Sequence, residues 1–354
     1  MTSVAVAMSG GVDSSAAAAI LLEQGYEVFG VSLHLWQEGQ APLEKSEAVE
    51  QARKVAAQLK IPFKAIDARD HFHARVVQSF VQDYLKGITP SPCVGCNRTV
   101  KWKAMLSYIQ DQKIDYVATG HYARLEQDEN GLMHLLRGSD PSKDQAYMLA
   151  FLGQEELSQT LLPIGGYEKR EIRAIARGFG LEAAERSDSQ DLCFLPGGDY
   201  RSFIKKNAVE VIRNGKIVTS TGEVLGEHQG LPFYTIGQRK GLGISTAKPV
   251  YVLHKDIENN QLVVAEKAAL GKKSFVVGRV NWILGSPAFE KIRVQVKIRY
   301  RAPLIWGALM LLESGQVHIQ LDEAQADITP GQVAVFYQDD EVLGGGIIQR
   351  AERS

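Results

Sequence analysis

Apolar and polar positions along the first 200 residues predict strands and helices in alternation. Short apolar runs predict strands at residues 4–8, 27–33, 63–67 and 116–119. Longer segments with a helical period lie at residues 13–24, 44–59, 71–85 and 98–110. Strands that alternate with helices form a parallel sheet with helices on both faces, and such sheets bind ligands beyond the carboxyl ends of their strands. We therefore predict an N-terminal α/β domain with a doubly wound parallel sheet.

From about Gly215 the pattern changes to short β-prone runs separated by turns. These runs lie at residues 275–280, 292–300, 309–312, 317–321, 333–337 and 343–349. Runs at this spacing predict a small antiparallel β-barrel. A Pro-Gly-Gly segment at residues 196–198 indicates one domain boundary, and a softer boundary falls near residues 265–272. The predicted units are a catalytic domain at residues 1–197, a small central domain at 198–266 and the barrel at 267–354.

The composition is that of an ordinary globular protein, with 45% hydrophobic and 23% charged residues. Apolar runs all fall short of the roughly 20 residues that a membrane span needs. The first residues also lack the pattern of a signal peptide, so we predict a cytoplasmic protein with no membrane partner. Residues 1–200 have a net charge of −6 and residues 201–354 of +5. The basic C-terminal half is suited to attract a polyanion such as RNA, although an excess of this size also fits ordinary solubility.

A glycine-containing loop, Ser-Gly-Gly-Val-Asp-Ser at residues 9–14, joins the first predicted strand to the first predicted helix. Gly10 and Gly11 allow a tight turn and a close approach to a ligand. The loop amides and the helix dipole together form an anion site, to which the serine hydroxyls add donors. Asp13 would repel phosphate unless a cation intervenes, and magnesium held by oxygen ligands is the expected intermediary. The competing interpretation is a plain glycine turn before a helix.

The chain has three cysteines, Cys93, Cys96 and Cys193, too few for a disulfide scaffold. Cys93 and Cys96 lie in a segment rich in proline and glycine, which predicts a loop before a helix. Cys96 would then lie near a helix N-terminus, where the pKa of a thiol falls. The interpretations are zinc binding, inert buried thiols, sulfur transfer, or an iron–sulfur cluster on three cysteines with one iron left open.

Taken together, these motifs resemble those of the tRNA-specific 2-thiouridylases, bacterial enzymes of the ATP-pyrophosphatase family that thiolate the wobble uridine of certain tRNAs. The resemblance covers nearly the whole chain. The matching motifs are MSGGVDS at 8–14, CVGCN at 93–97, ATGHY at 118–122, KDQ at 143–145, LCF at 192–194, GEHQG at 226–230, GQRKGLG at 237–243, TPGQ at 329–332 and LGGGII at 343–348. The resemblance implies an N-terminal fold of the adenine nucleotide alpha hydrolase type.

The resemblance also implies a reaction. ATP adenylates the C2 oxygen of the uridine at tRNA position 34 and pyrophosphate leaves. A sulfur-relay protein or a cysteine desulfurase loads a persulfide on Cys193, whose sulfur replaces the activated oxygen as AMP leaves. Cys96 resolves the persulfide, either through a disulfide with Cys193 or by releasing hydrosulfide. The implied cofactors are ATP and Mg²⁺, the implied substrates are tRNAs for Lys, Glu and Gln, and the enzyme is expected to be a monomer.

Site residues carry over from the family position by position. The residues implied to bind ATP are Ala7, Met8, Ser9, Gly10, Gly11, Val12, Asp13, Ser14, Leu33 and Gly120. The residues implied to contact tRNA are Ser91, Pro92, Cys93, His121, Lys143, Asp144, Gln145, Arg299, Tyr300, Arg301 and Gln332. Strand alternation places Arg299 and Arg301 on one face with Arg293 and Lys297, a basic stripe suited to RNA phosphates. Tyr122 and Tyr300 are candidate stacking platforms for a flipped base.

The sequence departs from the family at one position. Some members have an aspartate, proposed as a general acid/base, three residues before the first nucleophilic cysteine, and Cys93 occupies that position here. The acid/base assignment is therefore not carried over. The extra cysteine supports the alternative of a [4Fe–4S] cluster on Cys93, Cys96 and Cys193 that takes sulfide directly.

Two other functions compete with the thiolase. A different adenylating synthetase on the same N-terminal fold would not need paired loop cysteines or a basic β-rich tail. A non-catalytic RNA-binding protein would have no use for the phosphate loop at residues 9–14.

Overall fold

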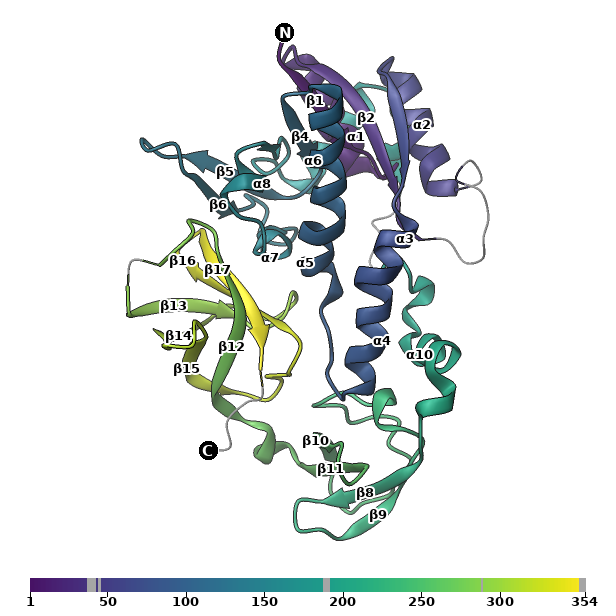
Figure 1. The fold of residues 1–354 in the computed structure, drawn as a ribbon, viewed down its shortest axis with the longest axis vertical. Helices are drawn as coiled ribbons and strands as arrows, with labels where there is room; N and C mark the ends of the chain where they lie inside the picture. Colours follow the sequence, from purple (N-terminus) through teal and green to yellow (C-terminus); the bar gives the residue numbers. More distant parts are fainter. Residues whose placement is uncertain (37–42, 44–45, 187–191, 288, 350–354) are drawn as a thin grey trace.

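A computed structural model describes residues 1–36, 43, 46–186, 192–287 and 289–349. The N-terminal α/β part lies at one end and a small four-stranded sheet at the other, while the β-barrel packs beside them (Figure 1). Helix α4 (Gln78–Leu85) runs from the α/β part towards the small sheet. In the described part of the chain, no helix combines the length and the apolar character that crossing a membrane requires.

The N-terminal sheet has five parallel strands in the order β3-β2-β1-β4-β7. The strands are β1 (Ser3–Ala7), β2 (Glu27–His34), β3 (Phe63–Asp67), β4 (Tyr116–Thr119) and β7 (Thr160–Leu161). The chain winds outward from β1 through β2 to β3 and then crosses back to β4 on the other side of β1. The switch point between β1 and β4 is where a sheet of this type binds its ligand.

Helices cover both faces of this sheet, as predicted. On one face, α1 (Val12–Glu23), α2 (Glu47–Leu59) and α9 (Lys169–Gly178) share a core with Val4 and Val6 of β1. On the other face, α6 (Lys103–Gln112) packs against Ala5 and its neighbours. Helix α1 has four consecutive buried alanines, whose small side chains let it lie close to its neighbours.

The helix predicted at residues 71–85 is present, whereas the next helical run begins earlier than predicted, at Pro92. Residues 69–85 form α3 (Arg69–Phe72), a π-helical turn and α4. Residues 92–112 form α5 (Pro92–Cys96), a π-helical turn (Asn97–Trp102) and α6. The predicted loop at the two cysteines is therefore wrong, because both lie inside a helix. Pro92 can begin it, since a proline in the first turn lacks an N–H that would have no helical partner anyway.

The remainder of the first part includes a β-hairpin that was not predicted. Strands β5 (Ala123–Gln127) and β6 (Met133–Arg137) pair with each other, and β6 also meets strand β17 of the barrel at Leu136 and Glu341. Short helices follow at α7 (Ala146–Leu149) and α8 (Gln154–Leu157).

The central part begins with helix α10 (Tyr200–Ala208) and continues into a four-stranded sheet in the order β10-β11-β8-β9. Its strands are β8 (Gly215–Thr219), β9 (Val224–His228), β10 (Val250–Asp256) and β11 (Gln261–Glu266). Strand β11 runs parallel to β8, whereas the other two pairings are antiparallel.

The C-terminal part is a closed antiparallel barrel of six strands, as predicted. Their order is β12-β15-β14-β13-β16-β17, and β12 pairs with β17 to close the ring. The strands are β12 (Lys272–Trp282), β13 (Lys291–Lys297), β14 (Ile305–Leu311), β15 (Val317–Gln325), β16 (Val333–Gln338) and β17 (Glu341–Ile348). Glycines make the closure tight, because a Cβ on Gly344 would lie 2.3 Å from the carbonyl oxygen of Asn281.

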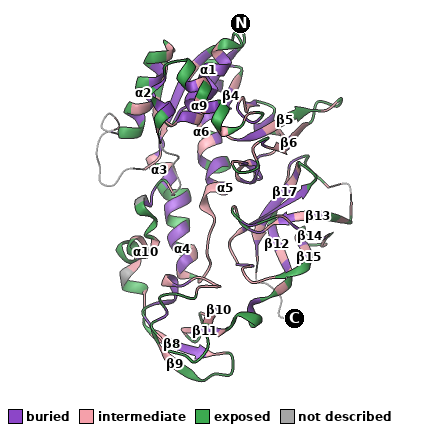
Figure 2. Cartoon of the chain, turned by 180° about the vertical axis from the view of Figure 1, so that it is seen from behind, coloured by how far each residue is buried: buried purple, intermediate pink, exposed green. Residues whose placement is uncertain are grey.

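The barrel and the α/β part share one apolar core. Tyr147 and Leu149 of α7 and Leu135 of β6 pack in a single cluster with Val335 and Val342 of the barrel. Buried residues accordingly lie on the barrel strands as well as on β1, α1 and α4 (Figure 2).

Candidate functional site

The glycine loop lies between β1 and α1, at the switch point of the parallel sheet. Gly10 has a φ of +78°, which favours glycine, and a Cβ there would lie 2.6 Å from Cβ of Gln51. The Met8 amide donates to the carbonyl oxygen of Val31 at 2.7 Å, so the loop leaves the sheet in a fixed direction. The left-handed backbone and the close packing therefore both require glycine at position 10.

Neighbouring strands bring the other predicted ATP-binding residues to the loop. Ala7 pairs with Val31 of β2 and with Thr119 of β4, so Leu33 and Gly120 lie near the carboxyl ends of the two flanking strands. A Cβ on Gly120 would lie 2.6 Å from the backbone nitrogen of Ser14. The structure thus brings the predicted ATP-binding residues together at the carboxyl edge of the sheet.

The loop serines bind one another and the loop backbone. The Ser9 and Ser14 hydroxyls lie 3.3 Å apart, and the Ser15 hydroxyl donates to the carbonyl oxygen of Gly11 at 2.8 Å. These bonds hold the loop in a preformed conformation. Ser9 is exposed and Ser14 and Ser15 are buried, so Ser9 is the loop serine open to a ligand.

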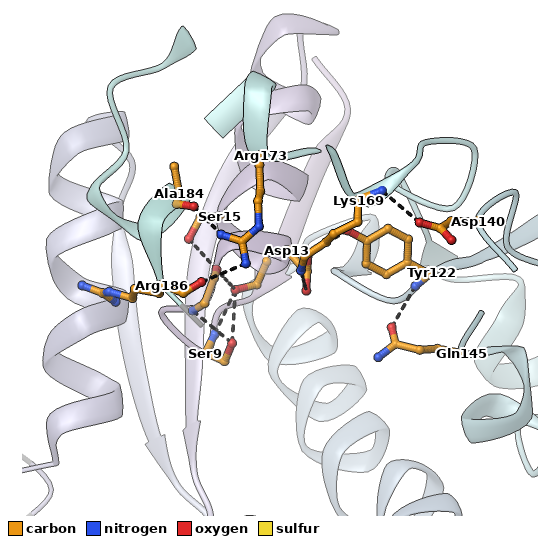
Figure 3. Close-up of polar contacts among 12 residues, drawn as sticks. Ser9, Asp13, Ser15, Tyr122, Asp140, Gln145, Lys169, Arg173, Ala184 and Arg186 are labelled. Carbon is orange, nitrogen blue, oxygen red and sulfur yellow. Dashed lines mark hydrogen bonds and ion pairs between the residues drawn. The ribbon is translucent and has the colours of Figure 1, made fainter. Parts of the chain in front are cut away.

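Asp13 already has a cationic partner. The Lys169 ammonium donates to both carboxylate oxygens of Asp13, at 2.7 and 2.9 Å, and the Tyr122 hydroxyl donates to Oδ1 at 2.8 Å (Figure 3). Lys169 comes from the first turn of α9, which packs against α1. Lys169 escapes prediction from the sequence, because nothing local shows that these two helix starts meet.

Two arginines fix the surroundings of the loop. Arg186 donates to the carbonyl oxygen of Gly10 at 2.6 Å. Arg173 donates to the carbonyl oxygens of Ala184 and Arg186, at 2.5 and 3.0 Å (Figure 3). With Lys169 they give the loop a basic border that suits a polyphosphate.

The cysteines lie in different surroundings. Cys96 is only 4% exposed and packs with Val100 and Phe194, Cys93 is half-buried, and Cys193 is exposed. Each is a free thiol. Burial is the main cause that raises the pKa of Cys96, and ionisation of Cys193 or Cys93 would raise it further, so the three thiols lie within electrostatic reach of one another. Of the predicted motif around Cys193, residues 188–191 lie outside the described residues.

The expectation of a lowered pKa at Cys96 is wrong. Burial raises the pKa of Cys96 to about 12, because Cys96 ends α5 in the interior of a longer helical run rather than at its start. Burial also raises the pKa of Cys93. The pKa of Cys193 is raised as well, because protein atoms around its sulfur displace water even though the residue as a whole is exposed. All three thiols are therefore protonated at neutral pH.

Lys101 opposes this effect at all three cysteines. Its positive charge lowers the pKa of Cys93, Cys96 and Cys193. It lies five residues after Cys96 in the π-helical turn, where bonding from residue i to i+5 brings the two positions onto one face. The role of Lys101 could not be predicted from the sequence, because no sequence pattern marks the π-helical turn that places it near the cysteines.

His121 connects the loop to the helical run at residues 92–112, which carries Cys93 and Cys96 and is hereafter the cysteine helix. It directly follows Gly120, its Nδ1 lies 2.8 Å from the Thr119 hydroxyl, and its ring lies 5.7 Å from that of Trp102. Burial, with a smaller contribution from the Lys101 charge, lowers the pKa of His121 to about 3. The imidazole is therefore neutral at physiological pH and can serve as a hydrogen-bonding group.

The Lys143–Gln145 segment is held mainly by its own polar side chains. Asp144 is buried, and its carboxylate accepts from the amides of Gly138 and Ala146. The Gln145 side chain accepts from the Tyr122 amide at 2.9 Å. Tyr122 is 1% exposed, so the idea that it stacks on a flipped base is wrong: its ring is packed in the core and its hydroxyl binds Asp13.

Residues predicted to contact tRNA converge from both ends of the chain. The Tyr147 and Tyr300 rings lie 5.8 Å apart, and the charges of Lys143, Asp144 and Arg301 all act on the Tyr300 hydroxyl. Burial raises the pKa of Tyr147, a hydrogen bond with Ser91 opposes this rise, and the nearby Cys93 adds to it. Tyr147 therefore connects Cys93 of the cysteine helix to Tyr300 of the barrel.

Gln332 ties the barrel to the segment before the cysteines. Its amide nitrogen lies 2.9 Å from the carbonyl oxygen of Thr89 and 3.3 Å from that of Pro90. The Thr89 amide donates to Pro330 at 3.1 Å. Gln332 thus supports the start of the cysteine helix at Ser91 and Pro92.

The predicted basic stripe on one strand is wrong. Strand β13 ends at Lys297, so Arg299 and Arg301 belong to the following turn. Arg299 pairs with Asp327, and Arg293 pairs with Asp322 at 2.5 Å. Alternation fails here because the strand stops before the arginines, but Arg299 and Arg301 are exposed.

A resident metal does not fit the cysteines as they stand. Among the described residues, no group of three or more His, Cys, Asp or Glu side chains is placed to hold a metal ion.

The parallel sheet, the loop at its switch point and the closed barrel define a nucleotide-binding α/β protein with two appended β domains. Family models match in the same order: a tRNA methyl transferase HUP domain at residues 2–197, a tRNA methyl transferase PRC-barrel domain at 201–266 and an aminomethyltransferase beta-barrel domain at 272–348.

Full-length relatives specify the family further. The tRNA-specific 2-thiouridylase MnmA of Moorella thermoacetica is 47% identical over 351 residues, which is 97% of this chain and 98% of that protein. The MnmA proteins of Chloroflexus aurantiacus and Acetivibrio thermocellus are each 44% identical, over 99% and 98% of this chain and 99% of their own length. The chain belongs to the tRNA-specific 2-thiouridylase family, which confirms the resemblance seen in the sequence.

Proposed function

We propose that this protein is an ATP-dependent tRNA sulfurtransferase that converts the wobble uridine, position 34, to 2-thiouridine. The observation that supports this most is the continuity of the site. The phosphate loop, His121, the cysteine helix and Tyr300 of the barrel form one connected neighbourhood. Family membership along the whole chain supports the same reaction.

The first step is adenylation. The C2 oxygen of the uracil ring bonds to the α-phosphorus of ATP, the bond from that phosphorus to the bridging oxygen breaks, and pyrophosphate leaves. The ring releases its N3 proton. The loop at residues 9–14 supplies amide donors for the phosphates, and Mg²⁺, when bound, would neutralise phosphate charge. Adenylation converts a poor leaving group into AMP.

The second step transfers sulfur. The terminal sulfur of a Cys193 persulfide bonds to C2, and the bond from C2 to the AMP oxygen breaks. Cys96 then attacks the Cys193 sulfur, which frees the thiouridine and leaves a Cys96–Cys193 disulfide for an external dithiol to reduce. Alternatively, Cys96 attacks the persulfide first and releases hydrosulfide as the nucleophile. Exposure of Cys193 suits a thiol that must receive sulfur from a donor protein.

The proposed partners follow from this chemistry. They are tRNAs with a wobble uridine, expected to be those for Lys, Glu and Gln, and a sulfur-relay protein or a cysteine desulfurase. We expect the enzyme to act as a monomer in the cytoplasm.

A direct test combines ATP, Mg²⁺, a persulfide donor and a tRNA transcript with uridine at position 34, and measures 2-thiouridine by mass spectrometry of the digested RNA. A matched transcript with cytidine at position 34 is the control and should gain no sulfur. Cys193→Ser should abolish thiolation while tRNA-dependent ATP–pyrophosphate exchange continues. Normal thiolation by Cys193→Ser would contradict the persulfide role.

Cys93→Ser distinguishes the persulfide from the cluster. A persulfide on Cys193 does not need Cys93, so this variant should retain much of the wild-type thiolation rate. A cluster on three cysteines would lose a ligand. Loss of activity in Cys93→Ser, together with iron in protein purified without oxygen, would favour the cluster.

A further inference from the structure

Phe194 directly follows the exposed Cys193 and is itself only 2% exposed. Both residues lie in a turn, which the Leu195 amide closes by donating to the carbonyl oxygen of Leu192 at 2.8 Å. The turn therefore carries two neighbouring side chains in opposite surroundings, a thiol that is open to solvent and a ring in the core. The function proposed above uses only the cysteine of this LCF motif and leaves the role of the phenylalanine open.

Four aromatic rings surround Phe194, and each meets it edge to face. The distances from the Phe194 ring centroid are 6.3 Å to Trp36, 5.7 Å to Phe72, 5.1 Å to Phe80 and 5.4 Å to Phe203. These four rings are hereafter the aromatic cage. Edge-to-face packing depends on the orientation of both rings, so the aromatic cage allows Phe194 few positions.

The aromatic cage is assembled from segments that are far apart in the sequence. Trp36 follows β2, Phe72 ends α3, Phe80 lies in α4 and Phe203 lies in α10. The three helices lie on the side of the molecule away from the barrel (Figure 1). Phe194 is therefore fixed by the packing of the whole region, and not by the short turn that carries it.

Cys96 packs in the same core cluster as Phe194 and the rings of α3 and α4. Because Cys193 is the chain neighbour of Phe194, the position of the Phe194 ring also sets how far Cys193 lies from Cys96. Ionisation of Cys193 would raise the pKa of Cys96, which agrees with this proximity. Reaction between the two sulfurs depends on that distance, since a misplacement of about 1 Å can slow a reaction roughly a hundredfold.

We propose that Phe194 is a positioning residue, whose buried ring holds Cys193 within reach of Cys96 while the Cys193 thiol stays exposed. The ring takes no part in bond formation and acts through the backbone that it shares with Cys193. A thiol that must meet both an external sulfur donor and a buried partner needs such an anchor. The consequence for sulfur transfer rests on the function proposed above, but the pairing of the two thiols does not.

The test measures the pairing of the thiols directly, in full-length protein that carries Cys93→Ser so that Cys96 and Cys193 are its only cysteines. Diamide removes two electrons and two protons from the thiols, the two sulfurs bond to each other, and mass spectrometry of peptides follows the Cys96–Cys193 disulfide with time. Phe194→Leu, which keeps an apolar side chain but removes the ring, should slow this reaction by roughly tenfold or more. Alkylation of Cys193 by iodoacetamide should stay within about twofold of the parent protein, because the thiol remains exposed.

Tyr84→Leu is the matched control for loss of a ring from this core. Tyr84 is buried in the same cluster, where it contacts Phe80 and Tyr200, and the variant should form the disulfide at the parent rate. Phe194→Met is a second variant, whose long flexible side chain fills the aromatic cage without fixing one orientation, and it should slow disulfide formation as well. Equal slowing by Phe194→Leu and Tyr84→Leu would indicate a loosened core and contradict the proposal. Disulfide formation at the parent rate in both Phe194 variants would overturn it.

Thiolation is scored separately, in protein that retains Cys93. Phe194→Leu should lower kcat for thiolation while KM for tRNA and ATP–pyrophosphate exchange stay unchanged, and a raised KM at constant kcat would instead assign Phe194 to RNA binding. Phe194-dependent disulfide formation without any 2-thiouridine from the wild type would refute the proposed function alone. Thiolation by the wild type, together with unaltered disulfide formation in Phe194→Leu, would refute this inference alone.

Discussion

Cys96 and Cys193 differ in what surrounds their sulfur atoms. Cys96 lies among apolar side chains of the cysteine helix and Phe194, whereas Cys193 is exposed. A thiol reacts as its thiolate, so the burial that raises the pKa of Cys96 to about 12 also makes it a slow nucleophile at rest. Cys96 therefore requires a change in its surroundings, such as substrate binding, before it reacts.

Alkylation by iodoacetamide, followed by mass spectrometry of peptides, should show this difference. At pH 7.5 Cys193 should react well before Cys96. The Cys96 rate should rise about tenfold per pH unit up to pH 10, because its thiolate fraction grows in that proportion below a pKa of about 12. Equal rates for the two cysteines at pH 7.5 would contradict the burial of Cys96.

Lys101 should influence all three cysteines together. Because its charge lowers their pKa values, Lys101→Met should raise them and shift the alkylation profile of each towards higher pH. Lys103→Met is the control, since Lys103 is exposed in the same helical run and is not among the charges that act on these thiols. If both variants shift the alkylation profiles by the same amount, the charge of Lys101 is not specifically responsible for lowering the pKa values of the three thiols.

Individual site residues were predictable where a local motif marks them. The glycines of the loop and the three cysteines are visible in the sequence because their residue types are unusual at that spacing. Lys169 and Lys101 are ordinary lysines in helices, and only tertiary contacts give them a place in the site. The arginines of the tail were predicted as a stripe, but β13 ends before them.

At the scale of elements, β4 and the glycine loop must fit closely. Gly120 directly follows β4 and lies against the first turn of α1, with no space for a side chain. The strands of the parallel sheet were predictable because their apolar runs are continuous. The cysteine helix was not, because Pro92 and Gly95 suggest a loop while buried Val94 and Cys96 stabilise a helix.

Gly120→Ala should therefore disturb the nucleotide site. The added methyl group would lie 2.6 Å from backbone atoms of Asp13 and Ser14, so β4 and α1 must separate. We expect a destabilisation of about 1–3 kcal/mol and a weaker affinity for ATP. Thermal unfolding and ATP titration measure the two effects. Gly166→Ala is the control, because a Cβ there meets no atom within 4 Å. If Gly120→Ala binds ATP as tightly as the wild type does, the close fit of β4 and α1 does not shape the nucleotide site.

At the scale of the whole molecule, the barrel supports the segment that precedes the cysteine helix. Gln332 holds the carbonyl oxygens of Thr89 and Pro90, just before the cysteine helix. The three-part layout could be predicted from the change of pattern along the chain. The contacts between the parts could not, since alternation shows which face of a strand is buried but not what covers it.

Gln332→Ala tests this support. Loss of the two hydrogen bonds should loosen the segment at residues 89–91 and lower kcat for thiolation several-fold, while ATP affinity stays unchanged. Gln338→Ala, at an exposed position at the end of β16, should behave like the wild type. If Gln332→Ala instead raises KM for tRNA at constant kcat, Gln332 contacts RNA and does not position the cysteine helix.

The core shared by α7, β6 and the barrel strands also limits how this enzyme can be rearranged by design. The family boundaries near residues 197 and 272 divide the chain, but they do not divide the packed interior. Grafting the barrel of a relative onto this catalytic part would have to bring matching partners for Tyr147, Leu149 and Leu135. A chimera that exchanges residues 272–348 together with 133–149 should therefore express as folded protein where an exchange of the barrel alone would aggregate.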